Sequence, residues 1–202
     1  MMIVRYAMGL ACAAALAACS SAPLRYYTLV PGELATKPLS SSAPSSIELV
    51  SVTVPPEVDV PQIVTRSGDT NMVLHDGDRW VAPLGDEIHA ALDDALLHQS
   101  NVQDVPPGGP VDSASTRIGI RVEQFDGTIG QHADLIVDWW MVPHGVSLGR
   151  RLTCQSVIQK SAAPNIDGLV RAYQMTIQEL AKEIVAAERA SAAGTLVATC
   201  HL

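Results

Sequence analysis

The chain has 202 residues, of which 48% are hydrophobic, and it carries 13 Lys and Arg against 21 Asp and Glu, a formal net charge of −8. This length is enough for one domain with a substantial core. The acidic balance argues against nucleic acid as a partner and against a basic patch for lipid headgroups.

Residues 1–18 have the layout of a secretory signal peptide. Arg5 provides the basic start, and the apolar run from Ala7 to Leu16 is shorter than the ~20 residues that span a bilayer. The tetrapeptide Leu-Ala-Ala-Cys at 16–19 follows the bacterial lipobox, in which small residues precede the cysteine that receives the lipid. The sequence therefore predicts cleavage before Cys19 and lipidation of that cysteine, with palmitate among the acyl chains. Each buried methylene of such an anchor contributes ~0.8 kcal/mol.

The residue after the lipidated cysteine indicates which membrane holds the anchor. Aspartate there favours retention in the inner membrane of many Gram-negative bacteria, whereas this chain has Ser20. We therefore expect the outer membrane, with the mature chain facing the periplasm. Loss of Arg5 with the signal leaves 12 basic and 21 acidic side chains, a net charge of −9, which fits a periplasmic domain.

Two cysteines remain outside the signal peptide and the anchor, Cys154 and Cys200. An oxidising compartment favours a disulfide between them, and closing that loop would contribute ~3–4 kcal/mol. The alternative is a buried thiol on a strand at Cys154 and a free thiol near the end of the chain at Cys200.

Residues 19–46 are predicted to be a lipid-anchored tether and flexible segment. It holds one extended piece, Arg25–Leu29, and a loop from Gly32 to Ser46 that is rich in Ser, Pro and Ala. Residues 47–202 are predicted to form a single periplasmic α/β domain.

The first half of this domain is predicted to contain strands followed by a helix. Residues 47–54 are apolar on both faces, as in a central strand of a covered sheet. Residues 62–66 and 71–75 flank a Ser-Gly-Asp turn and indicate a hairpin. Between Trp80 and His98 the apolar residues recur every three or four positions, with Pro83 suited to the first turn, so this segment predicts an amphipathic helix.

The second half is predicted to contain three strands and a long helix. Side chains alternate in character over residues 117–123, 135–141 and 152–158, a pattern typical of an antiparallel meander. Residues 165–189 carry one apolar stripe at helical spacing. The predicted fold class is an α/β (α+β) two-layer domain. It has a mainly antiparallel sheet and two packed amphipathic helices, in the order ββ(β)-α-βββ-α.

The sequence holds no convincing catalytic, metal or cofactor motif. Residues 145–149 match G-x-S-x-G around Ser147, but a hydrolase elbow needs a helix after the serine, and strands are predicted on both sides. Residues 75–78 place two acids at a predicted turn without the spacing of a calcium loop. We therefore predict neither enzyme, metal nor cofactor; an esterase that acts through Ser147 is the remaining enzyme hypothesis. Of Trp139 and Trp140, one ring is expected inside and the other outside, where it packs on the sheet or anchors an interface.

Several segments, in order, carry a resemblance to a known family. They are Arg25–Leu29 close to Cys19, Val52–Pro55, Val60–Arg66, Asp78–Leu84, Arg121–Phe125 with the strand that follows it, and the C-terminal helix. This pattern resembles the ABC-type transport auxiliary lipoproteins, the PqiC/YmbA family. The Asp59-Val60 step departs from the Leu-Asp-Arg of many relatives, so no role of a basic residue is carried over there.

The resemblance implies an outer-membrane lipoprotein that works with an inner-membrane permease and ATPase and with a periplasm-spanning MCE protein. Such systems are thought to carry lipids or other hydrophobic cargo, and the lipoprotein would dock the MCE protein as a homo-oligomeric ring and help to maintain the envelope. The segments that match the family best outside the helix core predict the partner interface at Pro61, Gln62, Ile63, Val64, Arg79 and Trp80. Trp80 has an alternative interpretation as a hydrophobic staple over the first helix.

A second interaction role stays open. A small α/β lipoprotein of this kind could instead activate or scaffold a cell-wall or envelope assembly machine. Neighbouring genes would separate the two, since a permease, ATPase and MCE set indicates transport and a cell-wall enzyme indicates the alternative.

Overall fold

The computed structural model describes residues 23–32, 45–99, 102–104, 115–142 and 151–193. The predicted signal peptide, Cys19, Ser147 and Cys200 lie outside these ranges. The described elements, in chain order, are β1 (Arg25–Tyr27), β2 (Ser45–Thr53), β3 (Gln62–Ser67), β4 (Asn71–Trp80), α2 (Leu84–Leu97), β5 (Val102–Asp104), β6 (Ser115–Thr128), β7 (His132–Val142), β8 (Leu152–Ser161) and α3 (Ile166–Ala192).

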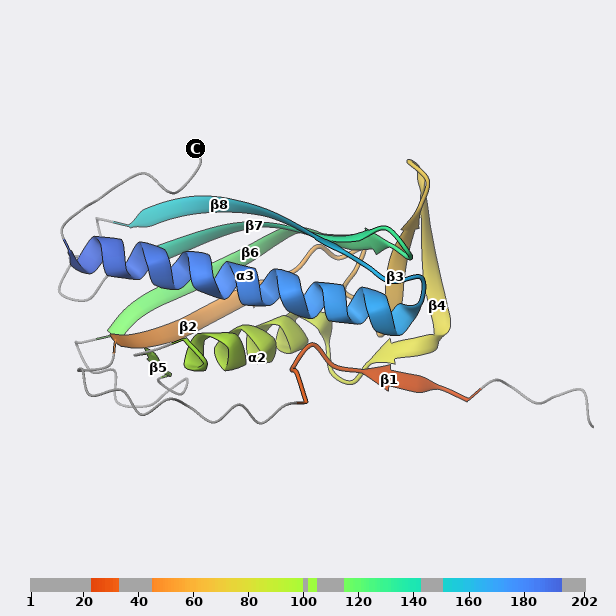
Figure 1. Cartoon of the computed structure of the whole chain (residues 1–202), viewed down its shortest axis with the longest axis horizontal. Coiled ribbons are helices and arrows are strands. Elements are labelled where there is room, and N and C mark those ends of the chain that lie inside the picture. The colour runs from red at the N-terminus through yellow and green to blue at the C-terminus, as the bar shows by residue number, and fades with distance from the viewer. Residues whose placement is uncertain (1–22, 33–44, 100–101, 105–114, 143–150, 194–202) are drawn as a thin grey trace, which may run out of the picture.

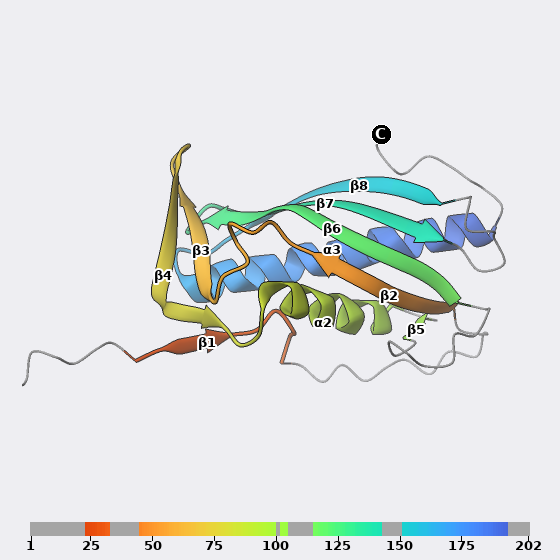
Figure 2. The same ribbon diagram turned by 180° about the vertical axis from the view of Figure 1, so that it is seen from behind.

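The main layer is a five-stranded sheet in the order β5-β2-β6-β7-β8, and α2 and α3 pack on one of its faces (Figures 1 and 2). The predicted α+β two-layer class and the predicted meander are confirmed, because β6, β7 and β8 are antiparallel neighbours. The sheet is nevertheless mixed, since β2 runs parallel to both β5 and β6. The chain returns from β2 to β6 through the β3–β4 hairpin and α2, and a long crossover of this kind permits parallel pairing.

A second, three-stranded sheet has the order β1-β4-β3 and stands at one end of the long axis (Figure 1). The predicted hairpin is confirmed, with Gly68 at φ 68° in its turn. The predicted turn at residues 75–78 is wrong, because these residues lie within β4. The pairing of β4 with β3 shifts register between Gln62 and Ile63, and β1 then pairs in parallel with Asp78–Trp80. This new partner keeps the strand extended where the sequence alone indicates a turn.

The predicted helices are confirmed with small changes at their starts. Helix α2 begins at Leu84 after the N-cap Pro83, so Trp80 belongs to β4 and not to the helix. Helix α3 begins after Asn165, whose side chain accepts a hydrogen bond from the Gly168 amide at 2.6 Å. Neither helix in the described part of the chain is long and apolar enough to cross a membrane.

The core lies between the five-stranded sheet and the two helices. The predicted alternation on β6, β7 and β8 is confirmed, since one face of each strand is buried against the helices. The two sheets are joined by an ion pair between Arg66 on β3 and the buried Asp126 on β6. The largest fully buried side chains include Tyr173, Leu29, Ile47, Ile63, Leu84, Ile88, Leu92, Ile118, Ile120, Leu135, Met141 and Leu169.

Trp139 and Trp140 point to opposite faces of the sheet, as predicted. Trp139 is buried and donates to Ser156 Oγ at 3.0 Å. Trp140 is half-buried on the other face, with the Arg151 guanidinium 5.2 Å from the centroid of its ring. Trp140 is paired across the strands with Gly119, whose missing side chain provides the space for the indole.

We expect Gly119→Ala to destabilise the protein, because a methyl group at this position would overlap the Trp140 ring. Overpacking of this kind costs about 1–3 kcal/mol, which urea denaturation of the two proteins would measure. Gly77→Ala is the matched control, since a methyl group there meets no atom within 4 Å. Equal stability of the two variants would contradict this account of Gly119.

Candidate functional site

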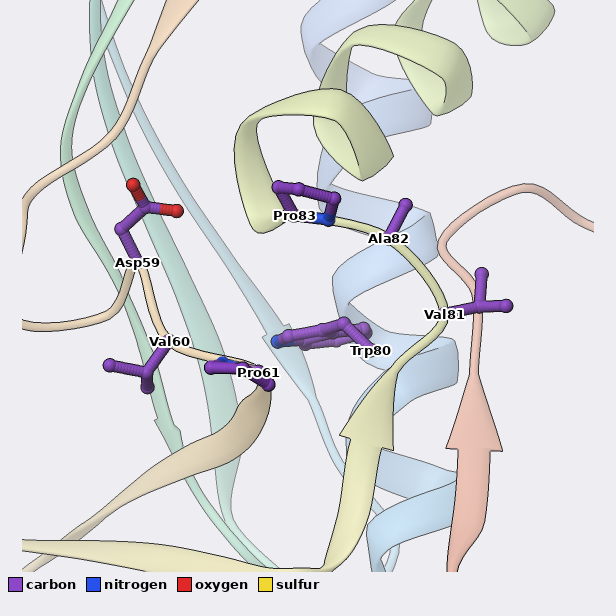
Figure 3. A pocket seen from close by; sticks show the side chains of 7 residues that line it. All are labelled: Asp59, Val60, Pro61, Trp80, Val81, Ala82 and Pro83. Atoms are coloured by element: carbon purple, nitrogen blue, oxygen red, sulfur yellow. The ribbon is translucent and has the colours of Figure 1, made fainter.

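A pocket lies between two segments that are about twenty residues apart in the sequence. Its walls come from the loop before β3, at Asp59, Val60 and Pro61, and from the link between β4 and α2, at residues 81–83. Trp80 lies between the two walls (Figure 3). The cavity measures about 430 Å³, within the range of pockets that bind ligands or partner side chains.

Backbone hydrogen bonds hold the two walls together. The Trp80 amide donates to the Pro61 carbonyl at 2.9 Å, and Gln62 pairs with Arg79 across the strands. Because proline lacks an amide hydrogen, Pro61 contributes only its carbonyl to this contact, and its ring is left at the wall of the pocket. These contacts join the two walls at Pro61 and Trp80.

Trp80 connects this pocket to the core. The ring is only 5% exposed, and its inner side contacts Phe125 and Tyr173 at centroid distances of 6.3 Å each. Phe125 and Tyr173 stack on each other at 4.2 Å. Burial raises the pKa of the Tyr173 hydroxyl far above its usual range, so this group stays neutral. Trp80 therefore forms the floor of the pocket and part of the core at the same time.

The pocket is chemically suited to binding an apolar group. Its lining is mostly apolar, with the Asp59 carboxylate at the rim. Across the described ranges, no three or more His, Cys, Asp or Glu side chains are grouped to hold a metal ion. An apolar floor with an aromatic ring and few polar groups favours an apolar side chain of a partner.

The structure separates the six residues predicted to contact a partner into two groups. Ile63 and Val64 are 0% and 5% exposed, so they support the wall from inside the core. Pro61 is exposed, and Gln62 and Arg79 are partly exposed beside the pocket. Direct contact with a partner stays a prediction for Pro61, Gln62 and Arg79, together with the pocket edge of Trp80.

A second feature holds Arg25–Leu29 against the rest of the molecule. It consists of these residues and their partners Asp78, Glu87 and Gln174, and we call it the β1 clamp. The buried carboxylate of Glu87 accepts hydrogen bonds from Thr28 Oγ1 and from the Leu29 amide, both at 2.8 Å. On the other helix, Gln174 Nε2 donates to the Thr28 carbonyl at 3.2 Å. Strand β1 is thus fastened to both helices, although the sequence places it in the tether segment.

Two side chains of β1 complete the clamp against neighbouring elements. Arg25 forms an ion pair of 2.7 Å with Asp78 on β4. Removal from water, and to a smaller extent the nearby Asp167 carboxylate, raises the pKa of Tyr27 to about 12. The Tyr27 hydroxyl therefore stays neutral at physiological pH.

A smaller pocket of about 180 Å³ lies between β8 and α3. Trp139, Ser156 and Glu183 form a hydrogen-bonded chain along its wall. Cys154 also lines it, is 3% exposed and takes part in a disulfide. Because Cys200 lies outside the described residues, the pairing of these two cysteines stays a prediction.

The sequence-based prediction missed five residues that line the pocket and the Glu87 carboxylate that holds β1; the five are Asp59, Val60, Val81, Ala82 and Pro83. Four of the five lie inside the family-matching segments Val60–Arg66 and Asp78–Leu84, and Asp59 directly precedes the first of them. Glu87 had its own signal, because it is a carboxylate on the apolar stripe of α2. A charge on a buried helix face indicates a specific hydrogen-bonding partner.

Comparisons with known proteins bear on both the fold and the family. Among solved structures, an uncharacterized protein aligns with a TM-score of 0.64 at 16% identity, over 82% of this chain and 98% of its own. Protein XCC0632 from Xanthomonas campestris, a DUF330 protein, aligns with a TM-score of 0.63 at 14% identity, over 87% and 100%. At these identities the solved structures bear on the fold alone.

Sequence comparison adds the family. The curated proteins give no significant match. The family described as ABC-type transport auxiliary lipoprotein component matches residues 27–185, which include Thr28, Leu29 and Glu87 of the β1 clamp, both walls of the larger pocket and most of α3. The match covers more than half of the chain, and the chain therefore belongs to the ABC-type transport auxiliary lipoprotein components.

Proposed function

We propose that this protein is the outer-membrane docking subunit of an ABC/MCE-type intermembrane transport system, held by lipid on Cys19 and facing the periplasm. The family match over residues 27–185 is the observation that carries the proposal. The partners are a periplasm-spanning MCE protein and an inner-membrane permease and ATPase, and the cargo is a lipid or another hydrophobic molecule. The role is one of binding and structure, without catalysis, and it helps to maintain the envelope.

In this proposal the MCE partner inserts an apolar side chain into the pocket above Trp80. The support is geometric, because Phe125 and Tyr173 already hold the Trp80 ring in place before a partner binds. Binding therefore costs little side-chain entropy at the floor of the pocket. Arg79 beside the pocket provides a positive charge for an acidic residue of the partner. Several copies arranged as a ring would surround the end of the partner.

Purification of the lipidated protein from envelopes, followed by mass spectrometry, tests this function. We expect the MCE protein and the permease and ATPase to co-purify. A double variant, Pro61→Glu with Arg79→Glu, should reduce recovery of the MCE protein at least tenfold, because it places acids at the apolar wall and reverses the charge. Membrane sedimentation of this variant should not change.

Pro164→Glu is the matched control, because Pro164 is also an exposed proline and does not line the pocket. Recovery of the MCE protein should be unaffected by it. A wild-type protein that stays monomeric and brings down no MCE protein would contradict the proposal. Co-purification of a cell-wall enzyme in its place would favour the assembly-scaffold alternative.

A further inference from the structure

The outward face of the β1–β4 pair carries exposed apolar side chains, and Leu24 among them follows the predicted lipidation site by five residues. Leu24 is 49% exposed, Tyr26 is 61% exposed and Val81 is 61% exposed. Side chains alternate along a strand, so Leu24 and Tyr26 point to the same side, opposite to Tyr27. Tyr26 pairs with Arg79, two residues before Val81, which places Val81 on that side too. We call these three residues the anchor-end patch.

The anchor-end patch belongs to the fixed part of the molecule. The Val81 amide donates to the Tyr27 carbonyl at 2.9 Å, and the β1 clamp binds the next two residues to Glu87. The exposure of Leu24 and Tyr26 is therefore a property of the folded body. A protein that leaves large apolar side chains exposed on a fixed surface usually covers them in a complex.

The covalent distance to the predicted lipid limits what can cover this patch. Five residue steps separate Cys19 from Leu24, and a fully extended chain spans at most ~3.6 Å per step, about 18 Å in total. Helix α3 has 27 residues and is therefore about 40 Å long. The tether is thus less than half as long as the body, so the β1 end cannot move far from the membrane.

The arrangement of the elements agrees with this limit. Strand β1 and the β3–β4 hairpin lie at one end of the long axis, whereas β5 and the end of α3 lie at the other (Figures 1 and 2). Arg25 does not share the side of the patch, because it faces with Tyr27 and forms its ion pair with Asp78. A tyrosine at an apolar edge is typical of surfaces at the boundary between lipid and water.

We propose that the anchor-end patch rests on the phospholipid bilayer that holds the Cys19 lipid. Leu24, Tyr26 and Val81 enter the boundary between headgroups and acyl chains. The inference rests on the lipid anchoring in the proposed function. Because the tether makes the encounter intramolecular, a patch of three apolar residues is sufficient. The long axis of the body is then held at a defined angle to the membrane.

Fluorescence quenching by lipid measures this contact directly. The lipidated protein is labelled with bimane at Val81→Cys and inserted into phosphatidylethanolamine–phosphatidylglycerol vesicles that contain doxyl lipid. Labelling is done without reductant, because Cys154 takes part in a disulfide, and the parent protein reports background labelling. Val157→Cys is the matched control, since Val157 is a 70% exposed valine on β8, away from β1 (Figures 1 and 2).

We expect at least twofold stronger quenching at position 81 than at position 157. Adding Leu24→Ser and Tyr26→Ser should remove most of this difference while circular dichroism stays unchanged. Equal quenching at positions 81 and 157, or quenching at position 81 that does not change with the serine substitutions, would overturn the proposal. Disulfide-linked dimers through Val81→Cys without lipid quenching would show that a second copy covers the patch, and this result would also overturn the proposal.

Failure of the proposed function would look different. If mass spectrometry finds no lipid on Cys19, the proposals of a lipid anchor, a docking role and a bilayer contact are all contradicted. If the lipidated protein shows the quenching difference but binds no MCE protein, only the docking role is contradicted. If it binds the MCE protein without the quenching difference, only the bilayer contact is contradicted.

Discussion

Replacement of Trp80 by alanine should lower the free energy of unfolding by about 3–5 kcal/mol, the usual cost of removing a buried aromatic side chain. The ring is 5% exposed and contacts both Phe125 and Tyr173, so its loss leaves a cavity beneath the larger pocket. Urea denaturation followed by circular dichroism would measure the change. Trp80→Phe should recover most of the stability, because an aromatic ring still fills the space.

Trp140→Ala is the matched control for this experiment. Trp140 is half-buried on the outer face of the sheet, next to Gly119 and with the Arg151 guanidinium 5.2 Å from the centroid of its ring. Its removal opens no internal cavity, so we expect a clearly smaller loss of stability than for Trp80→Ala. If the two alanine variants unfold at the same urea concentration, Trp80 is not the structural link between pocket and core.

Glu87→Ala should release β1 from the body. The carboxylate accepts two hydrogen bonds of 2.8 Å, and its removal leaves the buried Leu29 amide without that acceptor. Hydrogen bonds to a charged group contribute about 1.5–3 kcal/mol each, so we expect a destabilisation of about 2–3 kcal/mol after partial relaxation. Trypsin should then cut after Arg25 at least tenfold faster than in the wild-type protein, as mass spectrometry would show.

The neighbouring carboxylate provides the control for the clamp. Asp86 also lies in the first turn of α2, but its side chain is exposed. Asp86→Ala should therefore leave both the urea midpoint and cleavage after Arg25 nearly unchanged. Cleavage rates that rise equally in both variants would mean that the charge of the first turn matters, and not the specific bonds of Glu87.

The elements that the sequence predicts well are those with a strong local pattern. The apolar stripe of α3 and the alternation of apolar and polar side chains on β6, β7 and β8 depend only on which side chains face the core and which face solvent. The periodicity of the sequence is therefore enough to predict these elements. The strands that pair with β2 and β4 could not be predicted from local patterns. Nothing local at residues 76–78 indicates that β1, some 50 residues earlier, will pair with the end of β4 and keep it extended.

The candidate site was predictable only in part, and for a similar reason. The segments around Pro61 and Trp80 carry the family resemblance, and the structure brings them together through one backbone hydrogen bond. The sequence could not separate the wall residues that face solvent from those that face the core. Ile63 and Val64 follow Pro61 and Gln62 directly, yet they support the pocket only from within.

The parallel pairing of β1 with β4 has a mechanical consequence. With the proposed lipid on Cys19, a pull along β1 would stretch the ladder with β4, the Arg25–Asp78 ion pair and the Glu87 hydrogen bonds together. Bonds that stretch together resist force far better than bonds that open one after another. The force would pass into β4 and from there directly to Trp80, the last residue of that strand. The β1–β4 pair would therefore transmit such a force to the rest of the domain without unfolding first.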